Sequence, residues 1–351
     1  MTPYFEYGNI RLFNCDVLQG LLALGSESVQ CCVTSPPYWG LRDYGIDGQI
    51  GLEKTPEEYI EKMVQVFRGV HRGLKKDGTL WINMGDSYWG GKGASNYDWS
   101  RKNTDRATLQ KSQHNIMKRG ETRPQDGKHH TLKPKDLVGI PWMLAFALRA
   151  DGWYLRQDII WSKPNPMPES VTDRPTKAHE YIFLLSKSKN YFYDQEAILE
   201  PVSPNTNMRI SQNLAKQIGS ERANGGQKTN GRMKAVSRVY DPGKGNKSNP
   251  SYDSAVCLPV TKRNKRSVWT VTTKGFTGAH FATFPPKLIE PCILAGSRPG
   301  DVVLDPFWGS GTTGDVAIKH GRKAVGIELS ADYCDLSMKR FQQKTLNFMG
   351  E

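Results

Sequence analysis

A chain of 351 residues is long enough to bury one large core that carries an insertion, and an apolar content of 37% is that of a globular protein. The longest apolar stretch, 141–150, is too short to cross a bilayer, and the first residues lack a signal peptide's basic start and apolar middle. We therefore expect a cytoplasmic protein without membrane segments. Its six cysteines form no C-x-x-C pair, so we expect neither a disulfide framework nor a metal site.

The net charge of +13 is concentrated in two segments. Residues 90–135 hold 11 Lys and Arg against 4 Asp and Glu, and residues 201–266 hold 13 against 3, so the other 239 residues carry a net charge of −4. Such segments, rich in Gly, Asn and Ser, are also typical of solvated loops. Two of them on a mildly acidic body favour a polyanionic partner, because Lys and Arg placed along phosphates release counterions. We predict that this partner is nucleic acid.

The rest of the chain alternates strand and helix patterns, which predicts an α/β fold with a mostly parallel sheet. Strands are expected at 9–16 and 29–35, with a short helix between them. The clearest helix begins at Thr55, which has capping-box spacing to Glu58, and is expected to end at Gly78 before a strand at 79–86.

Beyond the first basic segment, the patterns predict further elements. They are a helix at about 136–150, an antiparallel strand pair at 153–163 and 180–188, a helix at 285–296, a strand at 301–307, a helix to about 320, a strand at 323–329 and a last helix from Ser330.

The stretch "DPFWGSGTT", residues 305–313, places a glycine-rich turn between a strand and a helix. Gly309 and Gly311 let the backbone turn tightly beside a ligand, and the helix start offers unpaired N–H groups. No Lys follows the glycines, so a nucleoside triphosphate is not indicated. Such turns are also common as pure structure. Because Glu328 ends the next strand, where it can accept hydrogen bonds from ribose hydroxyls, we predict a cofactor that contains adenosine.

The stretch "CCVTSPPYWG", residues 31–40, places a rigid aromatic turn after a strand. Two prolines fix the backbone and remove N–H donors. The exocyclic amine of a base is a poor nucleophile until acceptors hold its hydrogens, and the Ser35 hydroxyl with the Pro36 carbonyl can do so. Tyr38 would stack on a base rotated out of the duplex. Taken alone, the turn would be better interpreted as a rigid structural turn capped by surface aromatics.

Together the two stretches resemble the amino DNA methyltransferases that use S-adenosylmethionine. "TSPPYW" is similar to their (D/N/S)-P-P-(Y/F/W) catalytic motif, and "DPFWGSGTT" to their F-x-G-x-G cofactor motif. The catalytic motif comes first, as in the circularly permuted β group. The resemblance covers roughly 8–90 and 133–345, and it implies a Rossmann-like, seven-stranded, mostly parallel sheet that acts on double-stranded DNA.

The resemblance also implies a division of the chain. Residues 1–200 would form the N-terminal part of the methyltransferase domain, with the basic insertion at about 90–135. Residues 201–266 would form the target-recognition region, and residues 267–351 the C-terminal part with the cofactor motif.

The same resemblance assigns roles to single residues. Ser35, Pro36, Pro37 and Tyr38 would form the catalytic tetrapeptide. The cofactor would be bound by Asp16, Phe281, Thr283, Pro285, Asp305, Phe307, Gly309, Gly311, Thr312 and Glu328. The segment 161–188 is similar to the one that flanks the flipped base, and in it Lys163, Arg174 and His179 are the candidates for contact with DNA or the target base. Pro164 and Glu180 lie in the same segment, and His179 with Glu180 could equally be a structural pair.

Several alternatives stay open. In this family Ser at the first motif position is mostly associated with cytosine N4 and Asp with adenine N6, so Ser35 favours cytosine and adenine is the alternative. C5-cytosine methylation needs a nucleophilic Cys, but Cys292 lies in a predicted helix and is interpreted as core. A catalytically inactive DNA-binding module is disfavoured by the intact Ser35 and Tyr38. The recognition sequence and the oligomeric state, monomer or homodimer, cannot be inferred.

Overall fold

The computed structural model describes residues 1–41, 45–90, 129–203, 261–273 and 284–348. The chain forms two compact units, one of Met1–Ala197 with Arg266–Glu351 and one of Ile198–Lys265. The smaller unit is described at its two ends, where β7 (Glu200–Pro201) pairs antiparallel with β8 (Lys262–Arg263). Most of both basic segments lies outside the described residues, and so do the predicted site residues Phe281 and Thr283.

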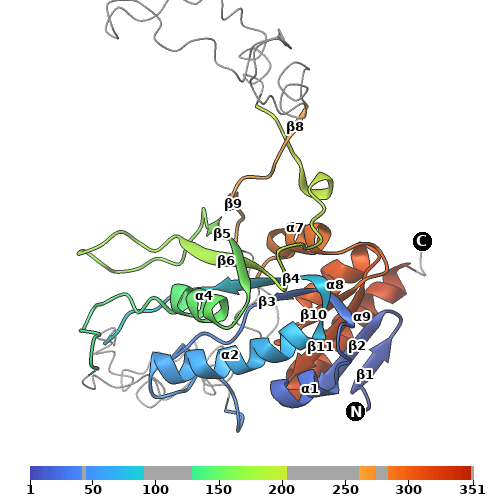
Figure 1. The fold of residues 1–351 in the computed structure, drawn as a ribbon, viewed down its shortest axis with the longest axis horizontal. Coiled ribbons are helices and arrows are strands. Elements are labelled where there is room, and N and C mark those ends of the chain that lie inside the picture. Colours follow the sequence, from blue (N-terminus) through green and yellow to red (C-terminus); the bar gives the residue numbers. More distant parts are fainter. Residues whose placement is uncertain (42–44, 91–128, 204–260, 274–283, 349–351) are drawn as a thin grey trace, which may run out of the picture. The chain divides into compact units, whose positions relative to one another are not determined.

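One nine-stranded sheet forms the centre of the larger unit, in the order β1-β2-β11-β10-β3-β4-β6-β5-β9 (Figure 1). Its strands are β1 (Phe5–Tyr7), β2 (Ile10–Asn14), β3 (Val29–Thr34), β4 (Leu74–Met84), β5 (Tyr154–Ser162), β6 (His179–Ser186), β9 (Val268–Thr270), β10 (Val302–Asp305) and β11 (Lys323–Glu328). The five strands from β2 to β4 are parallel, and β6 is antiparallel to both of its neighbours. The predicted α/β fold and its seven strands are confirmed, and the short strands β1 and β9 extend the two edges.

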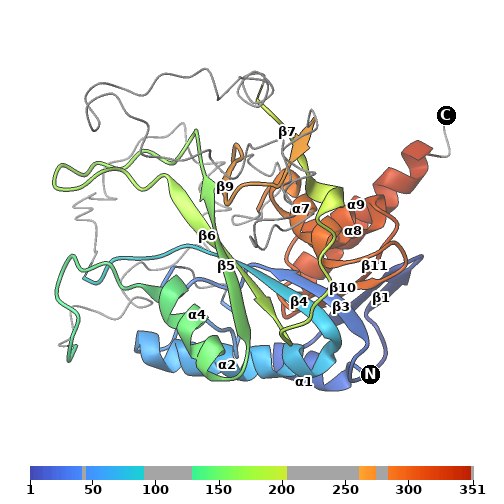
Figure 2. The same cartoon turned by 45° about the horizontal axis from the view of Figure 1, so that its top comes forward.

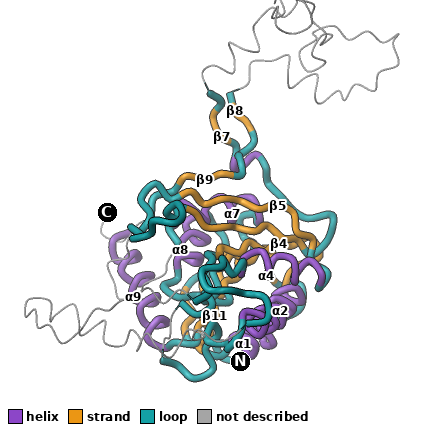
Figure 3. Tube along the Cα trace, turned by 90° about the vertical axis from the view of Figure 1, so that its left-hand side faces the viewer, coloured by secondary structure: helices purple, strands orange, loops and turns teal. Residues whose placement is uncertain are grey.

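Helices cover both faces of this sheet (Figures 1 and 3). One face carries α1 (Val17–Ala23), α2 (Pro56–Gly73) and α4 (Ile140–Ala150), and the other carries α7 (Pro286–Gly296), α8 (Thr312–Lys319) and α9 (Ala331–Phe348). Within the described ranges, no helix is long and apolar enough to span a membrane.

The helix α2 shows how the pattern of the sequence builds this packing. Tyr59, Met63, Phe67 and Val70 recur every three or four residues and are fully buried, so one stripe of the helix faces the sheet. Each such side chain contributes about 1.5–3 kcal/mol by leaving water. The Thr55 hydroxyl accepts a hydrogen bond from the Glu58 N–H at 3.2 Å, which confirms the predicted cap.

The predicted end of α2 at Gly78 is wrong, because the helix ends at Gly73. Leu74 is fully buried and already pairs with Val29 of β3, so residues 74–78 belong to β4. A Cβ at Gly78 would lie 3.1 Å from the Gln30 carbonyl oxygen. This glycine therefore allows a close approach of two strands rather than ending a helix.

The direction of the strands brings several loops to one edge of the sheet (Figure 2). The parallel strands β2, β11, β10, β3 and β4 all end there, and β5 ends there as well because it is antiparallel to β6. The strand β6 begins at this edge for the same reason. Ligands of open α/β folds bind at the carboxyl ends of the strands, so this edge is where the site is expected.

Candidate active site

The turn that contains Ser35 follows β3 directly and is anchored on both sides. The carbonyl oxygen of Pro37 accepts a hydrogen bond from the Tyr59 hydroxyl of α2 at 2.8 Å. Trp39 is buried, its indole N–H donates to the Glu53 carbonyl at 2.9 Å, and its ring stacks on Trp89 with centroids 6.1 Å apart. The turn is therefore fixed to the helical layer, while Ser35 itself stays half-buried at the sheet edge.

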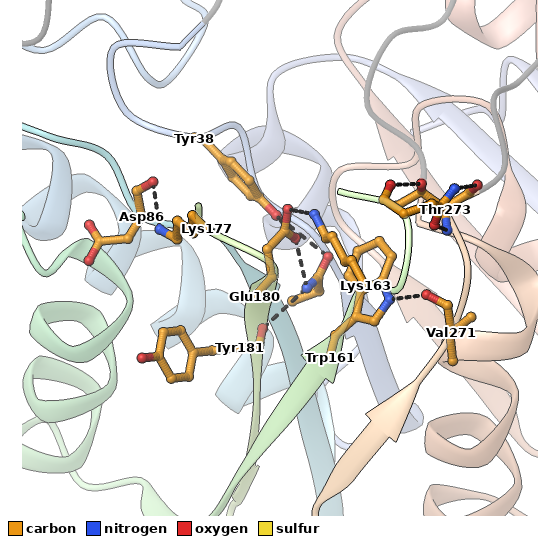
Figure 4. A network of polar contacts seen from close by, with 11 residues as sticks. Tyr38, Asp86, Trp161, Lys163, Lys177, Glu180, Tyr181, Val271 and Thr273 are labelled. Atoms are coloured by element: carbon orange, nitrogen blue, oxygen red, sulfur yellow. Dashed lines mark hydrogen bonds and ion pairs between the residues drawn. The ribbon is translucent and has the colours of Figure 1, made fainter. Parts of the chain in front are cut away.

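Tyr38 extends from this turn into a network of polar side chains (Figure 4). Its hydroxyl donates to Glu180 Oε2 at 2.8 Å, and the other carboxylate oxygen of Glu180 is paired with the Lys163 ammonium. The side-chain amide of Asn83 donates to Glu180 Oε2 at 3.3 Å and to the Tyr181 carbonyl at 3.1 Å. The network thus joins residues from four neighbouring positions of the sheet edge.

The electrostatics of this network keep Tyr38 protonated. Burial, and then the negative charge of Glu180, raise the pKa of the Tyr38 hydroxyl well above its usual range. The Ser35 hydroxyl and the Gly85 N–H act in the opposite sense and lower that pKa. Tyr38 is consequently a hydrogen-bond donor toward Glu180 at any physiological pH.

The three residues predicted to contact DNA or the target base lie in different surroundings. Lys163 lies in the Tyr38 network, whereas the Arg174 guanidinium donates to Glu169 at 2.7 Å and lies 4.1 Å from the centroid of the Tyr88 ring. The His179 ring is 3.4 Å from the Tyr181 hydroxyl. Successive strand residues point to opposite faces, which explains why His179 does not pair with Glu180. The two residues thus have separate partners within the protein, and the contact of His179 with DNA stays a prediction.

Asp305, at the end of β10, connects the two loops that the sequence analysis identified. Its Oδ1 accepts from the Thr34 hydroxyl at 2.7 Å and from the Phe307 N–H at 3.0 Å, and its Oδ2 accepts from the Thr313 hydroxyl at 2.6 Å. Thr34 directly precedes Ser35. Burial raises the pKa of the Asp305 carboxyl to about 7, against the opposing effect of these donors. The glycine-rich loop and the Ser35 turn are thus held in one fixed arrangement.

Glu328, at the end of β11, holds the glycine-rich loop from the other side. Its Oε2 accepts from the Gly309 N–H at 2.7 Å, and its Oε1 accepts from the Ser330 N–H at 2.9 Å. Burial raises the pKa of this carboxyl, and the backbone donors lower it. Gly309 and Gly311 have left-handed backbone angles, with φ of 52° and 77°, so the tight turn requires glycine at both positions.

Trp308 anchors the same loop and was missed by the sequence analysis. It is buried, and its indole N–H donates to the Ser337 hydroxyl at 3.1 Å. A Cβ at Gly314 would lie 2.1 Å from the Trp308 ring, and one at Gly326 would lie 2.3 Å from it. These two glycines therefore make room for the indole. A bulky residue inside a glycine-rich turn is the only sequence signal of this arrangement.

The remaining residues predicted to bind the cofactor lie around this loop. Asp16 caps α1, where its Oδ1 accepts from the N–H groups of Leu18 and Gln19 at 2.9 and 3.3 Å. Pro285 is the residue before the first turn of α7, and Thr312 is buried in the first turn of α8, where its hydroxyl accepts from Arg340 at 3.2 Å. Phe307 is partly buried against the core.

The chemistry of these acceptors fits an adenosine-containing group. A carboxylate can accept about four hydrogen bonds, and the two backbone N–H groups that donate to Glu328 leave capacity for hydroxyl groups. Only Oδ1 of Asp16 takes part in the cap of α1. Its other carboxylate oxygen, Oδ2, can therefore accept a hydrogen bond from an amine.

Glu57, His129 and His130 bring three potential metal ligands within 4.8 Å of one another. Nδ1 of His129 accepts from the N–H groups of Thr131 and Leu132 at 3.2 and 3.0 Å, so this nitrogen carries no proton. In the neutral ring the proton is then on Nε2, 3.3 Å from Glu57. The donor geometry thus favours a hydrogen bond to Glu57 over a metal ion.

Comparison with known proteins adds independent information. A sequence model of a family described as DNA methylase, of the N6 and N4 type, matches residues 29–339. The Type II methyltransferase M.Cfr9I of Citrobacter freundii is 45% identical over 343 residues, which cover 97% of this chain and 91% of that protein.

Solved structures show the same fold. The PvuII DNA methyltransferase, named as cytosine-N4-specific, has a TM-score of 0.60 at 18% identity and matches 97% of this chain and 89% of its own. A protein of Thermus thermophilus described as a DNA modification methylase, solved with S-adenosyl-L-methionine, has a TM-score of 0.52 at 21% identity and matches 95% of this chain and 93% of its own.

Proposed function

We propose that this chain, which belongs to the N6 and N4 DNA methylase family, moves a methyl group from S-adenosylmethionine to the N4 amine of a cytosine rotated out of double-stranded DNA. The observation that carries the proposal is the bond from Thr34 to Asp305 at 2.7 Å. This bond joins the turn that would hold the amine to the glycine-rich loop that would hold the cofactor. The reaction needs both at one edge of the sheet.

The residues of the chain would act mainly by positioning. The Ser35 hydroxyl and the Pro36 carbonyl would accept hydrogen bonds from the two N–H groups of the amine, which draws the nitrogen toward tetrahedral geometry and makes its lone pair available for attack. The bond between Pro37 and Tyr59 keeps this turn in place. When bound, S-adenosylmethionine would supply an electrophilic methyl group on a positively charged sulfur; the sulfur would leave as a neutral thioether, and the methylated amine would release one proton. Glu328 would accept hydrogen bonds from its ribose hydroxyls and Asp16 from its adenine amine.

Tyr38 would stack on the rotated base, because an aromatic ring is the surface on which an unstacked base regains contact. No covalent intermediate with the protein is required. Cys292, the one cysteine that follows a proline, is buried in α7, as the sequence analysis expected for a core residue.

Two observations support cytosine N4 over adenine N6. Ser35 stands at the motif position where Ser is mostly associated with cytosine in the resembling family. The PvuII enzyme, whose fold this chain shares, is named as cytosine-N4-specific. Adenine N6 is the second candidate, since its amine needs the same two acceptors and the same stacking ring.

The region 201–266 is proposed to recognise the DNA sequence. Its 13 Lys and Arg against 3 Asp and Glu provide the charge for phosphate contacts. Replacing it with a short Gly and Ser linker should remove the preference for the cognate site while leaving the binding of S-adenosylmethionine intact. Sequence-selective binding by that variant would place recognition elsewhere.

The central test is label transfer from S-adenosylmethionine to DNA by the wild-type protein and by Ser35→Ala. We expect Ser35→Ala to lose at least about 100-fold in rate, because one of the two amine acceptors is removed. Its affinity for S-adenosylmethionine, measured by calorimetry, should stay within about twofold. A Ser188→Ala variant, which changes an exposed hydroxyl outside the site, is the matched control. Full activity of Ser35→Ala would refute the proposed site.

A further inference from the structure

Glu180 holds together the polar network beside the Ser35 turn. Its side chain is 16% exposed, and that of its partner Lys163 is 18% exposed, so the ion pair is largely shielded from water. The same carboxylate accepts from the Tyr38 hydroxyl and from the Asn83 amide. Within the described residues, both of its oxygens are therefore engaged.

This arrangement fixes the ring of Tyr38 at three places. Its backbone is held between Pro37, bonded to Tyr59, and the buried Trp39. One edge of the ring lies against Gly85, where a Cβ would come within 2.8 Å of Tyr38 Cε2. The hydroxyl is held by Glu180. Without the last contact the ring would keep its position but lose the restraint on its orientation.

Lys163 is held from two directions. Its ammonium is paired with Glu180 and also lies 4.3 Å from the centroid of the Trp161 ring. The indole N–H of Trp161 in turn donates to the Val271 carbonyl at 2.8 Å (Figure 4). To reach a DNA phosphate, Lys163 would have to leave the shielded carboxylate uncompensated, which is costly.

We propose that Glu180 is a positioning residue for the target base, acting through the Tyr38 hydroxyl, and that Lys163 serves it by holding its carboxylate rather than by contacting DNA. The inference rests on the proposed function, since the base is what Tyr38 would face. It assigns the hydroxyl of Tyr38 a role that stacking alone does not require. It also gives Lys163 a role different from that of a phosphate contact.

The decisive variant is Tyr38→Phe, which keeps the stacking ring and removes the contact to Glu180 together with the longer one to Asn83 at 3.5 Å; Glu180→Leu removes the Glu180 contact and leaves the hydroxyl in place. In single-turnover methylation of cognate DNA, we expect Tyr38→Phe and Glu180→Leu each to lower the rate about 10- to 100-fold, the range for a hydrogen bond to a charged group. The double variant should be no slower than the slower single variant, because both act through one contact. Affinity for S-adenosylmethionine should be unchanged, which a general loss of folding would not allow.

Lys163→Met provides a second, independent readout. If Lys163 contacted a phosphate, Lys163→Met would bind DNA more weakly, and the salt dependence of its DNA affinity would fall by about one released counterion. We expect instead an unchanged salt dependence of DNA affinity and a lower methylation rate. Weaker binding with a reduced salt dependence would contradict the role given to Lys163.

Two matched controls separate these effects from unspecific damage. Tyr193→Phe removes the hydroxyl of an exposed tyrosine outside the site, whose ring centroid lies 6.4 Å from that of Trp81. Glu290→Leu removes a carboxylate of α7 that contacts Lys319 at 3.7 Å and His320 at 2.6 Å, away from the site. Both controls should methylate at the wild-type rate. Wild-type activity of Tyr38→Phe alongside an inactive Ser35→Ala would overturn the inference and leave the proposed function standing, whereas no label transfer by the wild-type protein would refute the proposed function itself.

Discussion

Two carboxylates on either side of β3 are held by opposite means. Asp305 accepts hydrogen bonds from two hydroxyls and one backbone N–H, all of them uncharged. Glu180 is paired with the ammonium of Lys163. On the side proposed to bind the cofactor (the cofactor side), the loops are thus fixed by short internal bonds within a packed core. On the side proposed to bind the base (the base side), they are fixed by a pair of long side chains. We infer that the first region can be disturbed only by disturbing the fold, whereas the second can be altered with the fold intact.

The largest effect is expected for Trp308→Ala on the cofactor side. Removing a buried indole from between Gly314 and Gly326 leaves a cavity, and such changes cost about 3–5 kcal/mol. Urea unfolding should show this loss, and binding of S-adenosylmethionine should weaken with it. Trp142→Ala, which removes a partly buried indole from α4, is the control for general loss of packing. Unchanged stability of Trp308→Ala would contradict the rigid core on this side.

Asp305→Asn tests the same side through its pH dependence. The folded-state pKa of about 7 lies above the ordinary value of 3.8, so the folded protein holds a proton that the unfolded chain releases between these values. The contribution of Asp305 to stability is therefore full below about pH 4, declines as pH rises toward 7, and is constant above, with a slope of up to about 1.4 kcal/mol per pH unit.

One hydrogen bond beside Asp305 depends on its protonation state. The single proton of the Thr313 hydroxyl faces two acceptors, Asp305 Oδ2 at 2.6 Å and the Val33 carbonyl at 3.3 Å. A proton on Asp305 would let Thr313 donate to Val33. We expect urea unfolding at pH 5, 6, 7 and 8 to show a flatter profile for Asp305→Asn than for the wild type. Parallel profiles would show that Asp305 titrates at its ordinary value.

The smallest effect on stability, with a clear effect on activity, is expected for Gly85→Ala on the base side. The added methyl would meet the Tyr38 ring at 2.8 Å and turn it from its place. We expect a methylation rate about tenfold lower, equivalent to about 1.4 kcal/mol, with an unchanged affinity for S-adenosylmethionine. Gly25→Ala, where a Cβ would come no closer than 3.8 Å to Ser28, is the control. Equal rates for the two variants would mean that the orientation of Tyr38 is unimportant.

Most of the fold could be predicted because its elements carry local signals. Seven strands read as apolar runs, and the helix α2 has both a cap and an apolar stripe. The strand β9 could not be predicted in this way, because its three residues pair with β5, more than a hundred positions earlier. The end of α2 was misplaced because Gly78 resembles a helix stop, and only the pairing of Leu74 with Val29 shows otherwise.

The same distinction between local sequence signals and long-range contacts applies to the site. The turn at Ser35 and the loop at Gly309 are contiguous in the sequence and were found from their residues. The bond of Tyr38 to Glu180 spans 142 positions, and that of Thr34 to Asp305 spans 271, so neither leaves a local pattern. Asn83 was missed for the same reason, although it lies near the end of β4, the strand next to β3.

The most direct test of the account is mass spectrometry of nucleosides from double-stranded DNA that has been incubated with the protein and S-adenosylmethionine carrying an isotopically labelled methyl group. We predict label on N4 of deoxycytidine with the wild-type protein, and at least about 100-fold slower labelling with Ser35→Ala. Label on deoxyadenosine would contradict the choice of base, and the absence of label from both nucleosides would contradict the proposed methyl transfer.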